Sequence, residues 1–412
     1  MNLLGIDRGG SGGFYSDLFS HETAPLQPND ADVPDAGAGF DAHQRNVSLD
    51  FIRGLMMVSM LFVDVCGDHL SFLSHAKWNG LPFADFIMPG FLFALGGSLS
   101  ISTSRRQQCT KHQRFMKSIR RCTRLFVLGI MLQGPWIPIA SKAKYTLGID
   151  LDRFRVMGIL QRIALCLLIL QVIVVYFKPI TWQALIVLTL LAVHTVISLL
   201  VAPQDCVEDS AFSIECNAQS YIDRLVLGRA HLYSPEDGYD PEGILGTLAC
   251  VFTCFIGFLS FHPIMVGTKR KLLISSILTA GGLICNYVGF PLNKALWTLS
   301  YNLITAAACL ACIAGLRSLS AVYFKNNPVT KLGANAIVFF ILSDCGGVAA
   351  AIINSFWVVR DGRRVTLLSI LQEDVLRVHE YPYMILVYAF MQLVLMMWLT
   401  NTLYRRGLLL TI

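Results

Sequence analysis

The sequence predicts an all-α polytopic membrane protein, a helical bundle of about ten transmembrane helices. Of its 412 residues, 54% are hydrophobic and 15% are charged, whereas an average soluble domain carries about 25% charged residues. Apolar runs of about 17 to 25 residues, the length that spans a bilayer, recur from residue 50 onward. No connection between them is long enough for a large soluble domain, so we expect the functional residues to lie within the bundle and its loops.

The apolar runs place the spans in order along the chain. They cover residues 50–66, 83–101, 122–140, 157–177, 181–201, 243–261, 272–290, 296–316, 333–357 and 381–403. The third run contains Gly134-Pro135-Trp136-Ile137-Pro138, which should kink or shorten its helix. Residues 1–44 are rich in Gly, Asp, Pro, Ser and Ala and are expected to form a disordered tail. Residues 45–412 then form one transmembrane domain.

Charge alternates between successive connections, which predicts how the chain is oriented. One set contains seventeen Lys and Arg and no Asp or Glu, and comprises residues 102–124, 177–180, 262–271, 317–331 and 404–412. By the positive-inside rule this set faces the cytosol, together with both termini. The opposite set includes the loop 202–242, with nine acids against two arginines. The net charge of +6 is spread over the loops, so it indicates orientation and lipid contact, not nucleic-acid binding.

Two cysteines, Cys206 and Cys216, share the loop 202–242, which is expected to be lumenal or extracellular. A disulfide is chemically permitted there, and we expect one between them. Cys309-x-x-Cys312 falls inside an apolar run and is expected to pack in the core. No residues have the spacing of metal ligands, so no metal is expected.

The connection between the first two spans concentrates polar residues. Residues 64–86 contain His75, Asp64 and Asp85 around a Trp-Asn-Gly turn. A histidine there can act as a base or nucleophile near neutral pH, and a carboxylate can fix its tautomer. The alternative for Asp85 is an acid that complements a helix dipole. For Asp64 the alternative is an ordinary interfacial acid.

Six short sequence blocks follow one another along the chain. They are Asp50-Phe51-Ile52-Arg53-Gly54; His75-Ala76-Lys77-Trp78-Asn79-Gly80-Leu81 with Ala84-Asp85 and Pro89; Arg155-Val156-Met157-Gly158-Ile159-Leu160-Gln161-Arg162; Tyr221-Ile222-Asp223-Arg224; Tyr239-Asp240-Pro241-Glu242-Gly243-Ile244-Leu245-Gly246-Thr247; and Asn293-Lys294-Ala295-Leu296-Trp297-Thr298-Leu299-Ser300-Tyr301. Together they resemble the catalytic membrane domain of the heparan-alpha-glucosaminide N-acetyltransferase family over about residues 45–412. An asparagine common in that family's first block is Asp64 here.

The resemblance implies transfer of an acetyl group from cytosolic acetyl-CoA to the amino group of a terminal glucosamine. The acceptor would be a heparan-sulfate-like glycan on the lumenal side of a lysosome or another endomembrane. His75, in the pattern His-x-x-Trp-Asn-Gly, is implied as the catalytic residue. It would either accept the acetyl group or deprotonate the sugar ammonium. Expected partners are the amino-sugar or glycan acceptor and the lipid bilayer, with a homodimer left open.

Further residues are candidates for binding substrate or CoA: Arg53, Trp78, Asn79, Arg162, Glu242, Trp297 and Ser300. Each also has a structural alternative. Arg53 can form an i, i+3 ion pair with Asp50. Arg162 lies in an apolar run and needs an anionic partner, for which Asp240 and Glu242 are candidates. Trp297 and Ser300 can instead pack against neighbouring helices. The basic loop 105–124 can bind either the phosphates of CoA or anionic lipid.

Two other functions fit the composition. A proton-coupled carrier could use Asp64, His75, Asp85 and Arg162 as a relay. An acyltransferase of the same architecture could use a different acceptor. A carrier would move an intact solute without CoA, whereas an acetyltransferase would release free CoA.

Overall fold

The structure is a computed structural model that describes most of the chain. The described residues are 46–105, 110–132, 136–138, 147–149, 154–201, 203, 211–316, 327–343, 356–360, 363–366, 370–378, 380–381 and 383–408. The expected tail 1–44 lies outside these ranges, as do Cys206 and parts of the predicted spans 122–140 and 333–357.

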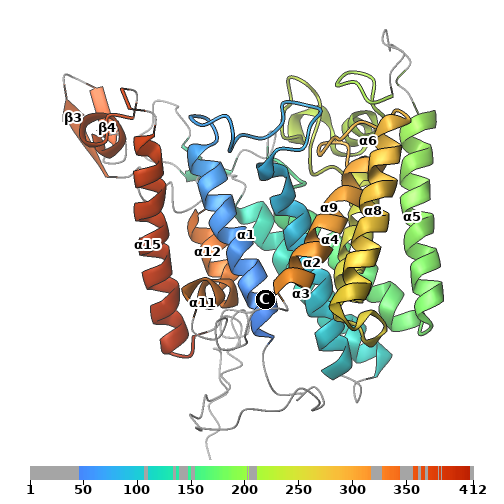
Figure 1. Cartoon of the computed structure of the whole chain (residues 1–412). Coiled ribbons are helices and arrows are strands. Elements are labelled where there is room, and N and C mark those ends of the chain that lie inside the picture. The colour runs from blue at the N-terminus through green and yellow to red at the C-terminus, as the bar shows by residue number, and fades with distance from the viewer. Residues whose placement is uncertain are drawn as a thin grey trace, which may run out of the picture.

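Helices form most of the described chain (Figure 1). The α-helices are α1 (Val47–Cys66), α2 (Ile87–Arg105), α3 (Lys111–Leu132), α4 (Ile159–Tyr176), α5 (Ile180–Leu200), α6 (Ala218–Leu227), α7 (Ile244–Phe261), α8 (Thr268–Tyr287), α9 (Leu299–Leu316), α11 (Pro328–Ala334), α12 (Ala336–Ser343) and α15 (Met384–Arg405). Short 3-10 helices are η2 (Phe83–Phe86), η3 (Arg229–His231) and η4 (Pro263–Met265), and η5 (Ile370–Val375) is a π-helix. Two antiparallel hairpins pair β1 (Trp136–Pro138) with β2 (Leu147–Ile149) and β3 (Trp357–Arg360) with β4 (Arg363–Thr366).

The all-helical membrane bundle is confirmed, but the count of ten spans is not. Within the described residues, six helices are long and apolar enough to cross a bilayer: Phe83–Arg105, Ile159–Tyr176, Ile180–Leu200, Ile244–Phe261, Leu299–Leu316 and Met384–Arg405. Helices α1, α3 and α8 are of spanning length, but each carries several charged residues. Length and apolarity alone therefore support fewer spans than the sequence predicted.

One predicted span differs clearly from the structure. The run 333–357 was expected to form a single helix, but residues 333–343 lie in the two short helices α11 and α12, which are separated at Asn335, and Trp357 begins strand β3. Helix α11 packs directly on α1. A Cβ added at Gly333 would lie 1.8 Å from the carbonyl oxygen of Asp50, and one at Gly54 would lie 1.9 Å from that of Val329. The backbones of α1 and α11 therefore lie in direct contact, which glycine at both positions allows.

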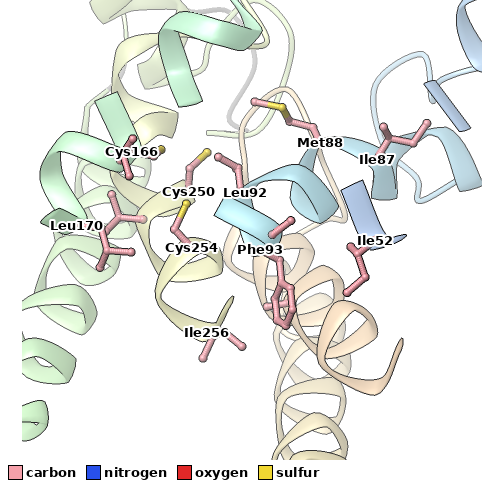
Figure 2. Packing of buried hydrophobic residues seen from close by; sticks show 14 of the residues in the cluster. Ile52, Ile87, Met88, Leu92, Phe93, Cys166, Leu170, Cys250, Cys254 and Ile256 are labelled. Atoms are coloured by element: carbon pink, nitrogen blue, oxygen red, sulfur yellow. The ribbon is translucent and has the colours of Figure 1, made fainter. Parts of the chain in front are cut away.

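Helix α7 lies at the centre of the bundle, since 78% of its apolar window is buried, against 28% for α5 and for α15. It crosses α2 closely. A Cβ at Gly96 of α2 would lie 1.8 Å from the carbonyl oxygen of Cys254, and one at Gly257 of α7 would lie 2.0 Å from that of Phe93. Small residues allow this approach, as is common between membrane helices. Figure 2 shows Phe93 and Cys254 within this core.

Candidate active site

The loop that joins α1 to η2 is held against the loop between α8 and α9. Gly80 has φ 136°, a conformation that favours glycine, and its N–H donates to the carbonyl of Leu292 at 2.7 Å. The side-chain amide of Asn293 donates to Oδ1 of Asn79 at 3.1 Å. The Trp-Asn-Gly turn therefore brings together two loops that are more than 200 residues apart in sequence.

The structure brings His75 and Asp85 into contact. Nδ1 of His75 lies 2.7 Å from Oδ1 of Asp85. The carboxylate is 1% exposed and the imidazole 46% exposed. A carboxylate only accepts hydrogen bonds, so Nδ1 carries the proton, and in the neutral imidazole Nε2 keeps its lone pair. Asp85 thus fixes the tautomer in which the free nitrogen of an accessible histidine can accept a proton or an acyl group.

The carboxylate of Asp85 is itself held by other groups. The backbone N–H of Ala76 donates to its Oδ2 at 3.3 Å. Nζ of Lys294 lies 3.3 Å from its Oδ1. The hydroxyl of Tyr301 donates to the backbone carbonyl of Asp85 at 2.6 Å, which ties α9 to η2. Sequence reasoning assigned no role to Lys294, although it lies in the last of the six blocks, because nothing in the sequence shows that this block meets the His75 loop.

Asp64 is not among the groups that contact His75. It is exposed near the end of α1. The polar contacts described for the His75 ring are with Asp85 and Lys294. A catalytic role for Asp64 stays a prediction.

A cleft lies beside the His75 loop. It has a volume of about 480 Å³ and is lined by Trp78, Asn79, Phe212, Ser213, Asn286, Gly289 and Pro291. Nε1 of Trp78 donates to the carbonyl of Phe212 at 2.8 Å, and the Trp78 ring meets the edge of Tyr239 at a centroid distance of 5.7 Å. The predicted binding residues Trp78 and Asn79 thus form part of a cleft wall.

A buried ionic network lies between the start of α4 and the start of α7. Arg155 donates through Nη2 to Oδ1 of Asp240 at 2.6 Å and through Nε to Oδ2 at 3.0 Å. It also contacts Glu242. Burial opposes ionisation of Arg155, but Glu242 and Asp240 outweigh this effect and raise the pKa of Arg155. Burial likewise raises the pKa of Glu242, but Arg155 and Arg162 outweigh it, so this pKa is lowered.

The two acids thus pair with Arg155 and not with Arg162, for which the sequence had suggested them. Arg162 is 1% exposed. Its Nη2 donates to the carbonyl of Gly243 at 3.0 Å, and its guanidinium lies 5.2 Å from the centroid of the Trp297 ring. A backbone carbonyl and an aromatic face stabilise this cation in place of a direct ion pair.

Trp297 and Ser300 are fully buried in the loop ahead of α9 and at its start. Trp297 has φ 48°, which is uncommon for a residue other than glycine. Oγ of Ser300 donates to the carbonyl of Pro291 at 3.0 Å. These contacts shape the loop that carries Lys294, and any direct contact of either residue with substrate stays a prediction.

At the other end of α1, Arg53 forms the predicted i, i+3 pair with Asp50 at 2.9 Å and also contacts Ser98. Arg53 and Arg121 both line a cavity of about 190 Å³, whose other walls are apolar residues of α1, α2, α3 and α4 and residues near the break at Asn335. The cavity is therefore lined by apolar side chains and by the two guanidinium groups of Arg53 and Arg121.

Cys216 takes part in a disulfide. Its expected partner, Cys206, lies outside the described residues. Within the described ranges, no group of three His, Cys, Asp or Glu residues could hold a metal ion.

Comparison with known proteins supports the resemblance seen in the motifs. Residues 45–212 match the family model described as heparan-alpha-glucosaminide N-acetyltransferase, catalytic. The mouse protein named heparan-alpha-glucosaminide N-acetyltransferase is 28% identical over 355 residues, which cover 71% of this chain and 52% of the relative. The human protein of the same name is 30% identical over 330 residues, which cover 66% and 49%. The chain spans about half the length of these curated relatives. The resemblance is thus confirmed, and the segment that matches the family's catalytic model, residues 45–212, includes His75, Asp85 and Arg162.

Proposed function

We propose that this membrane protein transfers an acetyl group from acetyl-CoA to the amino group of a terminal glucosamine, with His75 as the catalytic residue. The observation that carries the proposal is the pair of His75 and Asp85, 2.7 Å apart, on a segment that matches the family's catalytic domain. The pair supplies an accessible imidazole nitrogen whose partner nitrogen is fixed by a buried carboxylate.

His75 would act through Nε2 in either of two ways. As a base, Nε2 takes a proton from the sugar ammonium; the amine then forms the new C–N bond at the acetyl carbonyl, the C–S bond breaks, and the CoA thiolate leaves and takes up a proton. As a nucleophile, Nε2 itself attacks the carbonyl, releases the CoA thiolate, and passes the acetyl group to the deprotonated amine in a second step. Asp85 stabilises the imidazolium in the first route and orients the ring in both.

The cleft of about 480 Å³ beside the His75 loop is our candidate for the acceptor sugar. Its wall combines the aromatic rings of Trp78 and Phe212 with the side-chain amides of Asn79 and Asn286. Aromatic surface and amide groups are suited to the apolar faces and hydroxyls of a sugar ring. Because His75 lies three residues before Trp78, an amino group bound in this cleft would be near the imidazole.

The cavity that contains Arg53 and Arg121 is our candidate for the donor end. Arginine binds phosphate oxygens well, and CoA is rich in phosphate. Arg53 is thirteen positions from Cys66, the last residue of α1 before the His75 loop. That length corresponds to about 20 Å of helix, so donor and acceptor would enter from opposite ends of the bundle.

The predicted location and orientation belong to the same proposal. The donor end would face the cytosol together with both termini, and the acceptor end would face the lumen of a lysosome or another endomembrane. The excess of Lys and Arg in alternate connections supports this orientation. A homodimer stays open as the assembly state.

The test is transfer of labelled acetyl from acetyl-CoA to glucosamine by purified protein in detergent. Wild type and His75→Gln are compared, with His69→Gln as the control because His69 is an exposed histidine of the same loop. We expect transfer and CoA release by wild type and the control, and at least a 100-fold loss in His75→Gln. Folded wild type that transfers no acetyl to any of a panel of amino sugars would contradict the proposal. It would favour the carrier or an acyltransferase with another acceptor.

A further inference from the structure

Lys294, in the loop between α8 and α9, is the cation closest to the His75 pair. Its side chain is 20% exposed. Nζ lies 3.3 Å from Oδ1 of Asp85 and 3.3 Å from Nδ1 of His75. The lysine is 219 positions from His75 in sequence, so only the fold brings the two together.

The hydrogen bonds at this site define what Lys294 can do. Asp85 can only accept, so the Nδ1–H of His75 and the ammonium of Lys294 converge as donors on the same carboxylate oxygen. Lys294 cannot donate to a Nδ1 that already carries a proton. Its ammonium therefore acts on Asp85.

A carboxylate that is 1% exposed requires a positive charge nearby. Within the described residues, the groups in contact with its oxygens that can carry one are His75 and Lys294. If Lys294 supplies the charge, His75 can stay neutral. Without Lys294, the buried carboxylate would draw a proton onto His75, and protonated Nε2 would have no lone pair.

We propose that Lys294 is the positioning residue whose ammonium neutralises Asp85 and thereby keeps His75 uncharged and able to react. This inference deepens the proposed function and rests on it, because a neutral imidazole matters when His75 must accept a proton or an acetyl group.

Other titratable groups around the site are already engaged or exposed. Glu242, ahead of α7, interacts electrostatically with Lys294 but contacts Arg155 directly. Tyr301 of α9 uses its hydroxyl on the backbone carbonyl of Asp85. The exposed charged or titratable residues on the loop and at the end of α1 are Asp64, Asp68, His69 and Lys77. None of these donates to the Asp85 carboxylate in the described hydrogen bonds, so Lys294 remains the cation placed to balance it.

The experiment reads the charge of His75 directly. Diethyl pyrocarbonate modifies neutral imidazole, and the rate at His75 can be followed by mass spectrometry of its peptide as pH is varied. The variants are Lys294→Gln, which keeps a donor but removes the charge, and Lys294→Arg, which keeps the charge. The matched control is Lys77→Gln, which removes an exposed lysine from the same loop.

We expect the pH of half-maximal modification to rise by about one unit or more in Lys294→Gln. It should stay near the wild-type value in Lys294→Arg and Lys77→Gln. The acid limb of the acetyl-transfer pH profile should move in the same direction, with recovery of kcat at higher pH. An unchanged modification profile in folded Lys294→Gln would overturn the inference, since a merely structural lysine would leave the charge of His75 unaffected.

The modification assay also separates this inference from the proposed function, because it requires no acetyl donor or acceptor. A wild-type protein that transfers no acetyl, but whose His75 profile shifts in Lys294→Gln, would contradict the proposed function and leave the role of Lys294 intact. Acetyl transfer by wild type, with no shift of the His75 modification profile in Lys294→Gln, would support the proposed function and contradict the role of Lys294.

Discussion

Asp85 lies 2.7 Å from Nδ1 of His75, although nine residues of turn and 3-10 helix separate the two in sequence. The carboxylate is buried and the imidazole is accessible. The sequence alone left two roles open for Asp85, a partner of His75 or an acid at a helix start. The structure shows that it contacts His75 and that it also lies in the 3-10 turn that precedes α2.

Replacing Asp85 with Asn should reverse the tautomer of His75. An amide that donates to Nδ1 places the ring proton on Nε2, so the reactive nitrogen loses its lone pair. We expect kcat for acetyl transfer to fall at least 100-fold while KM for the acceptor changes little. Steady-state kinetics would check this, with Asp68→Asn as the control because Asp68 is an exposed acid of the same loop. Full activity in Asp85→Asn would contradict the assigned tautomer.

Breaking the buried ionic network should destabilise the fold. Arg155→Met leaves Asp240 and Glu242 buried without their cation. We expect a loss of about 3 to 5 kcal/mol in the free energy of unfolding, seen as a lower Tm in detergent. The matched control is Arg377→Met, which breaks the exposed pair with Glu380, 3.6 Å apart, and should change stability by less than about 1 kcal/mol. Equal effects of the two substitutions would contradict the importance of the buried network.

Asp223 should make stability depend on pH. Burial raises its pKa from 3.8 to about 7, although its Oδ1 accepts from the N–H of Ile244 at 2.9 Å. Because the folded pKa is above the unfolded one, the charged form is disfavoured in the fold. The neutral carboxyl of Asp223 therefore contributes its full stabilisation below about pH 4. This stabilisation is lost as pH rises toward 7 and is absent above pH 7.

Asp223→Asn removes this dependence and keeps an acceptor for Ile244. The three-unit shift corresponds to about 4 kcal/mol at most, so the variant should be more stable than wild type at pH 8, and this advantage should fall to about 1 kcal/mol at pH 4.5. Tm measured across this range would show it. Glu236→Gln, which changes an exposed acid, should follow wild type at every pH. A constant difference between Asp223→Asn and wild type would mean that the carboxyl does not titrate in this window.

The crossing of α2 and α7 should not accept a larger residue. In Gly96→Ala the new methyl group would meet the backbone of Cys254 at 1.8 Å, so the helices must separate. We expect a loss of about 1 to 3 kcal/mol. Gly281→Ala is the control, because its nearest atom is a side-chain carbon of Leu303 at 3.8 Å and alanine favours helix. A Gly96→Ala protein as stable as wild type would contradict the close backbone packing.

The sequence predicted the parts of the fold that depend on long apolar runs. Helices α4, α5, α7 and α9 begin and end within a few residues of the predicted spans, since a bilayer-length apolar run has few alternatives to a helix. The His75–Asp85 contact was also among the predicted alternatives, because the two residues share one short loop. The sequence did not predict the tertiary contacts between distant segments. The pairing of Asp240 and Glu242 with Arg155 and the approach of Lys294 join segments far apart in the chain, and no local pattern reports such distances.

The break between α11 and α12 is in contact with the residues that follow α15. Asn335, at the break, donates through Nδ2 to the backbone carbonyl of Leu408 at 3.3 Å, and residues beside it line the cavity that contains Arg53. Interrupted helix at bilayer depth is tolerated where protein or water covers it, and not where lipid does. The short segment that follows α15 thus fastens the break between α11 and α12 to the end of the last helix. Shortening the chain before Leu408 would remove this acceptor for the side-chain amide of Asn335.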